Sequence, residues 1–404
     1  MPAPGLVIFD DGRGRFGPLT DLRAAHELRT GAMTTGERAA TALNMTVCAH
    51  IVPSELADIV AERSDAAVNK IPPGDCLLVN ARLPALHGRV AQQIAALPVD
   101  HALTLPDGQV AAVRLDSRRA EQWMADRFGA LRGMQTTVLP DVGLIDRPWD
   151  IIARLDATLR ADLDLLAPRH ERKTLPDHVH VFGDTGVHVD AAAKVHPMTV
   201  LNCEKGPIVI DAGAIVGSFT VVAGPCYIGR DAIVVPQSHV RSNTVIGPRC
   251  VVGGEISWSV LQGYANKCHA GYLGHSLVGE WANLGADTTV SNLKNTYGHV
   301  RVQLDPDTAP QDSQQTKLGP IIGDHVRTAI GSRLLTGSCL GTGTMIALSG
   351  FAPKCTGRFA FHTDSDAQKY DIDKFIAAAR YAMSRRDVEL TPAVEARLRA
   401  LAAI

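Results

Sequence analysis

The residues best suited to chemistry gather in one stretch of the chain, Asn266–Asn292. It contains two histidines, a lysine, a tyrosine, a glutamate and three asparagines. A histidine imidazole has an ordinary pKa of about 6.5, so it is the side chain best matched to proton transfer at neutral pH. His269 is the first candidate, and His275 follows six residues later as the second. The alternative is that both are surface histidines, hydrogen-bonded in turns of the chain.

A second candidate site is the loop Asp10–Thr20, which follows a predicted strand. Its sequence alternates glycine and arginine at Gly12, Arg13, Gly14 and Arg15. Backbone N–H groups and a guanidinium suit anionic oxygens, so this loop could hold a phosphate. The geometry of a tight turn would explain the glycines equally well.

Four histidines lie close together in sequence, at His178, His180, His188 and His196. The spacing of the first two places both on one side of a strand, so a zinc site is geometrically possible. Solvated histidines at the edge of a sheet are the better explanation. We therefore expect no structural metal.

A six-residue repeat must position the histidine-rich stretch. An aliphatic residue stands at every sixth position, namely at Ile210, Val216, Val222, Ile228, Val234, Val240, Ile246 and Val252. Four residues after each, the side chain is small in seven of the eight cases. This period fits a parallel β-helix in which three hexads, about 18 residues, close one triangular coil. A filled prism has no interior pocket, so any site must lie on its outer faces or corners.

The repeat is interrupted twice, at 256–271 and at 291–319, and we expect insertions there. It resumes at Tyr272, Val278, Leu284 and Val290, and for a last time at 322–346. Insertions leave a solenoid through its corners and often build the site. This register points Tyr272 toward the axis, so core packing explains that residue as well as a functional role does.

Before the repeat, β-type and α-type segments alternate, which predicts a mainly parallel α/β sheet. Strands are expected at 6–10, 45–52, 76–82 and 135–139, with a hairpin at 99–115, and helices at 34–43, 54–63, 86–97, 119–131 and 147–166. After the repeat, two helices are expected, at 373–384 and from Thr391-Pro392 onward, with Arg385-Arg386 in solvent or at subunit contacts. The predicted domains are 1–174 (α/β), 175–349 (β-helix) and 350–404 (helical tail).

Composition narrows the class of protein. The formal net charge of −2 and the lack of a basic run argue against nucleic acid or an anionic membrane as partner. No apolar stretch approaches about 18 residues, and no secretory signal is evident. The eight cysteines are scattered without a C-x-x-C pair, which indicates free thiols in a reducing cytoplasm.

Several motifs then resemble a known family. They are His269-Ala-Gly-Tyr272-Leu-Gly, Val278-Gly, Asn283-Leu-Gly-Ala, Thr288 and Asn292. This stretch resembles the acetyltransferase half of the bifunctional UDP-N-acetylglucosamine pyrophosphorylase / glucosamine-1-phosphate N-acetyltransferase. The runs 293–298 and 318–331 are more similar to the sugar nucleotidyltransferase branch related to that enzyme. The resemblance covers roughly residues 1–390 and is specific only from about residue 206 to 341.

The resemblance implies a left-handed β-helix, a homotrimer and acetyl-CoA as the acyl donor. It places His269 on the general base that deprotonates an acceptor amine, and transfer would be direct, without a covalent enzyme intermediate. Further residues that it implies in binding the acceptor or the cofactor are Lys267, Tyr272, Asn283, Asn292 and Lys294.

Two departures from the family leave parts of this interpretation open. The family's Tyr-Asp-Gly is Leu293-Lys294-Asn295 here, so the acceptor sugar is not fixed. The strand that ends in a metal-binding aspartate in nucleotidyltransferases ends here in Val79-Asn80-Ala81-Arg82. Asparagine lacks the charge that Mg²⁺ prefers. Mg²⁺ therefore stays only a possible cofactor of the α/β domain.

The leading hypothesis is a cytoplasmic, acetyl-CoA-dependent N-acetyltransferase that acts on an amino-sugar phosphate such as glucosamine-1-phosphate. The first alternative is a sugar-1-phosphate nucleotidyltransferase whose β-helix serves only for assembly. The second is a non-catalytic protein that binds a nucleotide sugar.

Overall fold

Two compact units make up the chain in the computed structural model, which describes residues 4–84, 86–129, 131, 133–167 and 175–404. The first comprises Met1–Arg15, Leu22–Leu28 and Met33–Arg147. The second comprises Phe16–Asp21, Arg29–Ala32 and Pro148–Ile404. Within the described residues, no helix has the length and apolarity needed to cross a bilayer.

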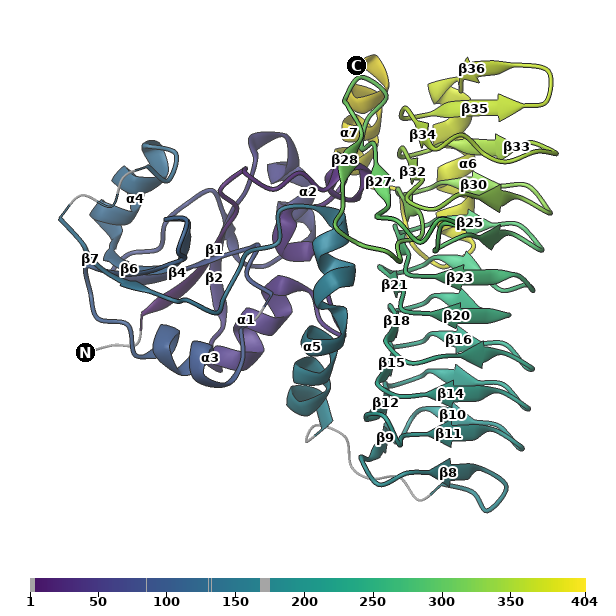
Figure 1. The fold of residues 1–404 in the computed structure, drawn as a ribbon. Coiled ribbons are helices and arrows are strands. Elements are labelled where there is room, and N and C mark those ends of the chain that lie inside the picture. Colours follow the sequence, from purple (N-terminus) through teal and green to yellow (C-terminus); the bar gives the residue numbers. More distant parts are fainter. Residues whose placement is uncertain (1–3, 85, 130, 132, 168–174) are drawn as a thin grey trace. The chain divides into compact units, whose positions relative to one another are not determined.

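The first unit is built on a seven-stranded sheet of order β3-β2-β1-β4-β6-β5-β7 (Figure 1). Its strands are β1 Gly5–Phe9, β2 Val47–Ile51, β3 Ala67–Val68, β4 Asp75–Asn80, β5 His101–Thr104, β6 Val110–Asp116 and β7 Gln135–Val138. The pairs of β6 with β4 and with β5 are antiparallel, and the other four pairs are parallel. The predicted mainly parallel α/β sheet and its hairpin are confirmed.

The helices of this unit follow the predicted alternation. They are α1 Thr35–Leu43, α2 Ala57–Arg63, α3 Gly88–Ala95 and α4 Ser117–Ala125, with short 3₁₀ turns at Ala25–Glu27 and Ser54–Leu56. The start of α1 is fixed by a capping box, in which Thr34 and Glu37 each accept the other's backbone N–H. The core beneath the sheet holds Phe9 against the ring of Trp123, at 5.1 Å between centroids.

The second unit is a parallel β-helix with three flat faces, typical of the left-handed hexapeptide-repeat fold (Figure 1). The first face contains β10 Lys194–Val195, β13 Ile215–Val216, β16 Ile233–Val234, β19 Val251–Val252, β22 Asn266–Lys267, β25 Asn283–Leu284, β30 Arg327–Thr328, β33 Met345–Ala347, β35 Ala360–Thr363 and β36 Ala367–Lys369. The second contains β8 His180–Phe182, β11 Val200–Asn202, β14 Val221–Ala223, β17 His239–Val240, β20 Glu255–Ser257 and β23 Tyr272–Gly274. The third contains β9 Val187–Val189, β12 Ile208–Ile210, β15 Cys226–Ile228, β18 Thr244–Ile246, β21 Val260–Leu261, β24 Leu277–Val278, β29 Ile321–Ile322, β32 Cys339–Leu340 and β34 Cys355–Thr356.

The hexad column predicted from the sequence forms the axis of the β-helix. All eight aliphatic residues from Ile210 to Val252 are 0% exposed, and the small residues that follow them are buried at the corners. The residue just before a corner repeatedly takes a left-handed conformation, as Phe219, Asp231, Gln237 and Asn243 do with φ of 55–61°. Each such turn redirects the chain to the next face. The hexad interpretation is therefore confirmed.

The first predicted interruption, 256–271, contains shortened coils and no insertion. Val252 pairs with Lys267 and Ile256 pairs with Leu273, so these coils are 15 and 17 residues long instead of 18. The expected inward position of Tyr272 is therefore wrong by one residue. Leu273 fills the axis and is 0% exposed, whereas Tyr272 is half-buried beside it.

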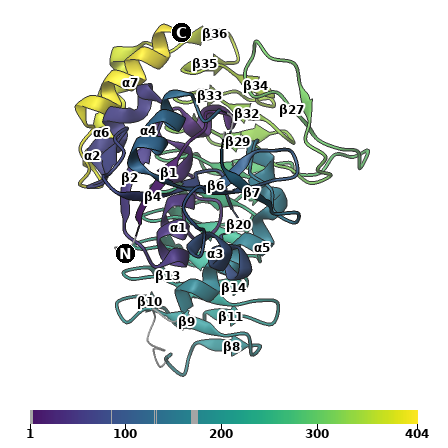
Figure 2. The same ribbon diagram turned by 90° about the vertical axis from the view of Figure 1, so that its left-hand side faces the viewer.

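The second interruption, 291–319, is a true insertion. It follows β26 Thr289–Val290, which pairs with β31 Arg333–Leu334. It carries an antiparallel pair, β27 Arg301–Val302 and β28 Gln311–Asp312, and projects from the β-helix (Figure 2).

The β-helix also extends beyond the predicted end at residue 349. β34 pairs in parallel with β32, and β35 pairs in parallel with β33. The hexad signal is absent there because Thr356 and His362 take the positions opposite Leu340 and Ile346. The tail helices α6 Ile372–Ser384 and α7 Pro392–Ala403 follow as predicted, and they pack against each other.

Helix α5 Pro148–Leu166 belongs to the second unit, although the predicted boundary at residue 174 placed it in the first. Its buried face contacts β12 and β15, and Arg160 donates to the Lys205 carbonyl at 2.7 Å. The 3₁₀ turn Gly17–Thr20 likewise packs on β29 and β32. Of the predicted phosphate-binding loop, only the part up to Arg15 therefore lies in the first unit.

Candidate functional site

A cavity of about 550 Å³ lies on the first face of the β-helix, under helix α6. Strand alternation points Asn266 and Asn283 outward into it, because their neighbours Lys267 and Leu284 face the axis. The Asn266 side-chain amide donates to the Asn283 side-chain oxygen at 2.6 Å. Residues around the cavity are Val251, Tyr264, Asn266, Trp281, Ala282, Asn283, Arg327, Ala378, Tyr381, Ala382, Arg385 and Arg386.

The walls of this cavity combine positive charge with aromatic rings. Three arginines, Arg327, Arg385 and Arg386, contribute to it, and none of the described residues around it is Asp or Glu. The rings of Tyr264 and Trp281 stack at 4.3 Å between centroids with an angle of 16°. Such a lining suits a ligand that carries both phosphate groups and a planar ring.

His269 lies at the corner between the first and second faces, directly after β22. Its side chain is exposed. Three residues separate it from Asn266, so their Cα atoms are at most about 11 Å apart. The imidazole is thus within reach of a ligand whose far end projects from the cavity.

Lys267 supports this corner from inside the prism. It occupies an axis position and is 1% exposed. Its ammonium donates to the backbone carbonyls of His269 at 2.5 Å, Ala270 at 3.0 Å and Gly253 at 3.4 Å. Burial lowers the pKa of the ammonium to about 8. Lys267 therefore does not contact a sugar phosphate, which corrects the role expected for it.

His275 belongs to a separate cluster on the second face. Its Nδ1 lies 2.7 Å from the side-chain nitrogen of Asn292, which also donates to the Tyr272 hydroxyl at 3.0 Å. The imidazole stacks on Trp258 at 5.4 Å between centroids. Burial, with smaller effects of Lys317 and Arg241, lowers the pKa of His275 to about 4. An imidazole with so low a pKa is a weak general base at neutral pH.

Lys294 lies at the start of the insertion and is exposed. Its ammonium donates to the backbone carbonyl of His299. The structure therefore distributes the predicted residues over three places: Asn283 at the cavity, His269 at the corner, and Tyr272 with Asn292 at the His275 cluster.

The glycine–arginine loop of the first unit follows β1, at the carboxyl edge of the sheet. Arg15 turns back on the loop and donates to the carbonyls of Gly12 and Gly14, at 3.0 and 3.3 Å. Arg13 is exposed and lines a cavity of about 480 Å³, together with Phe9, Asp11, Thr104, Gly108, Val110, Trp123, Phe128, Gly129, Leu131 and Thr136. Of the two predicted arginines, Arg13 is the one placed to meet a ligand.

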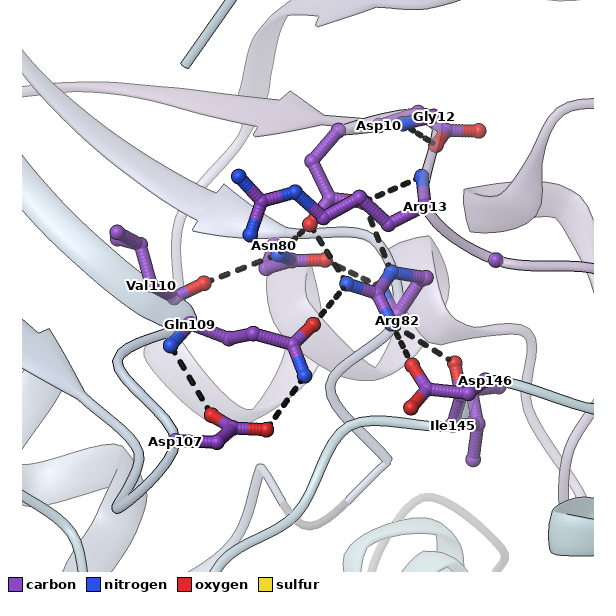
Figure 3. A network of polar contacts seen from close by, with 12 residues as sticks. Asp10, Gly12, Arg13, Asn80, Arg82, Asp107, Gln109, Val110, Ile145 and Asp146 are labelled. Carbon is purple, nitrogen blue, oxygen red and sulfur yellow. Dashed lines mark hydrogen bonds and ion pairs between the residues drawn. The ribbon is translucent and has the colours of Figure 1, made fainter. Parts of the chain in front are cut away.

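A buried arginine stands beneath this loop (Figure 3). Because β1 and β4 are parallel neighbours, residues that follow them meet at one edge, which brings Arg82 beside Asp11. The guanidinium Nε and Nη2 donate to the two Asp11 oxygens at 2.9 and 2.6 Å. Nη2 also donates to Gln109, and Nη1 donates to Asp146 and to the Ile145 carbonyl. All five N–H donors of Arg82 thus have an acceptor.

The donor set at this edge does not fit Mg²⁺. Beyond Arg82, the Asp11 oxygens accept the Asn80 side-chain amide and the Arg13 backbone N–H, both at 3.1 Å. Four hydrogen bonds use the lone pairs that a carboxylate would offer to a cation. Burial would raise the pKa of Asp11, but the guanidinium outweighs this effect and lowers it. Asp10 accepts two backbone N–H groups, from Gly12 and Ala25.

The histidines considered for zinc lie on different faces. His180 is in β8 of the second face, and His188 is in β9 of the third. Among the residues that the structure describes, no group of three or more His, Cys, Asp or Glu side chains is arranged to hold a metal ion.

Comparison with known proteins adds to this geometry. Residues 6–171 match the family described as sugar nucleotidyl transferase. The bifunctional protein GlmU of Jannaschia sp. (strain CCS1) is 31% identical over 162 residues, 39% of this chain and 34% of that protein. A bifunctional sugar-1-phosphate nucleotidylyltransferase/acetyltransferase of Sulfurisphaera tokodaii is 33% identical over 139 residues, 34% of each chain. These matches confirm the predicted resemblance.

The chain spans about a third of the length of these curated relatives (34% in both cases). Among solved structures, the UDP-N-acetylglucosamine acyltransferase of Francisella novicida matches with a TM-score of 0.34 and 12% identity, over 53% of this chain and 74% of that chain.

Several residues of these sites were not predicted. Arg385 and Arg386 were expected in solvent or at subunit contacts, and Arg327 was not singled out, yet all three line the cavity. The 17-residue step from Asn266 to Asn283 is the one sequence signal that could have pointed to that face. Arg82 was noted only as the neighbour of Asn80.

Proposed function

We propose that the second unit is an acetyl-CoA-dependent N-acetyltransferase that acts on an amino-sugar phosphate, with His269 as the general base. The observation that carries this proposal is the arginine-lined cavity on the first face, three residues from an exposed histidine. The relatives named as nucleotidylyltransferase/acetyltransferase support the same class of reaction.

The cavity fits the donor by its charge and shape. Acetyl-CoA carries phosphate groups and an adenine ring at one end and the thioester at the other. Arg327, Arg385 and Arg386 would hold the phosphates, and the stacked Tyr264 and Trp281 offer a flat surface for the ring. The volume of about 550 Å³ is that of an ordinary cofactor pocket.

His269 would supply the proton transfer. The acceptor amine is an ammonium at neutral pH and must lose a proton before it can attack the acetyl carbon. His269 takes that proton, the C–N bond forms as the C–S bond breaks, and the proton returns to the departing thiolate. Lys267 holds the backbone of this corner through the carbonyls of His269 and Ala270, so the imidazole starts from a fixed position.

Three further residues are proposed on the acceptor side. Lys294 is exposed at the start of the insertion, where its ammonium could meet a phosphate. Tyr272 and Asn292 share a hydrogen bond on the adjoining face. We also propose that the chain assembles as a homotrimer.

The test is thiol release from acetyl-CoA with glucosamine-1-phosphate and a panel of other amino sugars. We expect His269→Ala to lower kcat by at least about 100-fold, the usual contribution of a general base. His275→Ala is the matched control and should retain most of the activity, since the low pKa of His275 makes it a weak base. Unchanged turnover in His269→Ala would exclude the assigned role.

A second substitution tests the donor site. Arg385→Ala should raise KM for acetyl-CoA by about tenfold and leave kcat nearly unchanged, because a charge-assisted contact is lost. Arg380→Ala is the control on the same helix, since Arg380 pairs with Glu395 and does not line the cavity. Equal effects of the two substitutions would place the donor elsewhere.

The second candidate function is sugar-1-phosphate nucleotidyl transfer by the first unit, favoured by the family match over residues 6–171. Its test is pyrophosphate release from UTP and N-acetylglucosamine-1-phosphate in the presence of Mg²⁺. The saturated Asp11 carboxylate counts against it.

A further inference from the structure

The environment of Arg82 differs from that of a residue that waits for a ligand. Its side chain is 0% exposed, and each of its five donors is already engaged. The side chain of its partner Asp11 is 5% exposed and accepts four hydrogen bonds. The pair is therefore complete without any added cation or anion.

We infer that the first unit binds the phosphate groups of a nucleotide or nucleotide sugar without a divalent cation, and that the Arg82 guanidinium takes the cation's place beside Asp11. The inference does not depend on the proposed acetyl transfer by the second unit.

The charge balance supports this assignment. In a metal-dependent site, a divalent cation neutralises the carboxylates at the strand ends and the incoming phosphates together. Here Arg82 neutralises Asp11 and contacts Asp146, which is 45% exposed. A phosphate group then needs only one more positive charge, and Arg13 supplies it from the rim of the cavity.

The cavity beside Arg13 also provides for a planar ring. Phe9, Trp123 and Phe128 form one aromatic group, with centroids 5.0–5.1 Å apart. The hydroxyls of Thr104 and Thr136 and the open backbone at Gly108 offer polar contacts in the same wall. A volume of about 480 Å³ lies within the range of small-molecule sites. Phosphate and base can thus be recognised by one cavity.

The consequence for activity is specific. Nucleotidyl transfer depends on a cation to offset the charge that develops on the phosphates. With Asp11 saturated and Arg82 fully engaged, neither can serve that step. The first unit then binds its ligand and does not turn it over.

The experiment measures binding and metal separately on the full-length protein. Calorimetric titration with UDP-N-acetylglucosamine and with UTP should give the same Kd, within about twofold, in excess Mg²⁺ and in EDTA. Electron paramagnetic resonance of added Mn²⁺ should show only free ion, with and without nucleotide. Pyrophosphate alone should bind at least about tenfold more weakly, since it lacks the base.

Two substitutions locate the site. Arg13→Ala should weaken nucleotide binding by about tenfold or more. Arg89→Ala, the same change of charge at an exposed position of α3, should leave it unaltered.

Four outcomes would overturn the inference: Mn²⁺ bound to the wild-type protein together with nucleotide, binding that disappears in EDTA, pyrophosphate that binds as tightly as the nucleotides, or no binding of either nucleotide. None of these measurements requires a variant at Arg82, whose removal could unfold the unit.

Discussion

At the scale of single residues, Lys267 is the most unusual group in the β-helix. Its axis neighbours are aliphatic, and an ammonium buried among them is costly unless all its protons find acceptors. The carbonyls of Gly253, His269 and Ala270 provide those acceptors. The residue thus exchanges apolar packing for a fixed backbone at the corner that carries His269.

The lowered pKa of Lys267 predicts a pH-dependent stability. In the folded protein its pKa is about 8, compared with 10.5 for the free side chain. Between these values the unfolded chain binds a proton that the folded chain does not, so the free energy of unfolding rises with pH through this window. Relative to Lys267→Met, the wild-type protein should gain at most about 3 kcal/mol from pH 8 to pH 10.5. Urea unfolding at a series of pH values measures the difference.

The comparison with Lys267→Met cancels the titration of tyrosines and cysteines over the same pH range. A difference that stays constant with pH would contradict the assigned burial. The variant should also lose kcat in thiol release, because two corner carbonyls lose their donor.

At the scale of elements, helix α6 is one wall of the donor cavity, and its attachment depends on Phe375. That side chain is 4% exposed and meets Phe359 at 4.9 Å and His325 at 5.7 Å between ring centroids. The helix begins at Asp371, whose carboxylate accepts the Lys374 N–H. The cavity therefore exists only while this helix is docked on the first face.

We expect Phe375→Ala to detach α6. Loss of the buried ring costs about 3–5 kcal/mol. Amide hydrogen exchange over Ile372–Ser384 should accelerate, and KM for acetyl-CoA should rise several-fold, while the β-helix strands stay protected. Phe351→Ala makes the same chemical change at a side chain that is 59% exposed, and it should alter neither quantity. Slow exchange of α6 in Phe375→Ala would contradict this account of its attachment.

The β-helix was predictable from the sequence because its repeat is local. One aliphatic residue per hexad is enough to assign the axis, and Ile210 to Val252 follow that rule without exception. The prediction failed where coils change length. A coil of 15 residues brings Lys267 onto the axis, and a coil of 17 residues replaces Tyr272 by Leu273. A fixed period cannot reveal such changes, because the partner of each strand is known only once the coils are stacked.

The candidate sites were less predictable, since they join residues that are distant in sequence. Asn283 was found through the family resemblance, but the arginines opposite it come from a tail helix whose sequence shows only an amphipathic pattern. Likewise, Asn80 indicated that a metal ligand was missing. That Arg82, two residues later, would satisfy Asp11 depends on the register between β1 and β4.

At the scale of the whole molecule, the flat faces of the β-helix favour side-by-side association, and closed rings are the usual result. The side chains of Val181 and Phe182 on β8 are 45% and 54% exposed, so apolar surface is available for such contacts. We expect mass photometry to give one species of three 43.1-kDa chains at nanomolar concentration. A monomer that persists at micromolar concentration in analytical ultracentrifugation would contradict the proposed trimer.

The closed network around Arg82 also constrains how the first unit can evolve. Loss of Arg82 alone would leave Asp11 buried without its counter-charge, at a cost of about 3–5 kcal/mol. Gain of an aspartate at position 80 alone would add a second carboxylate to a guanidinium whose donors are already used. Each single step toward a metal site therefore passes through a less stable protein, and the order of mutations matters more than their number. A guanidinium that completes its own shell makes this change of function hard to reverse.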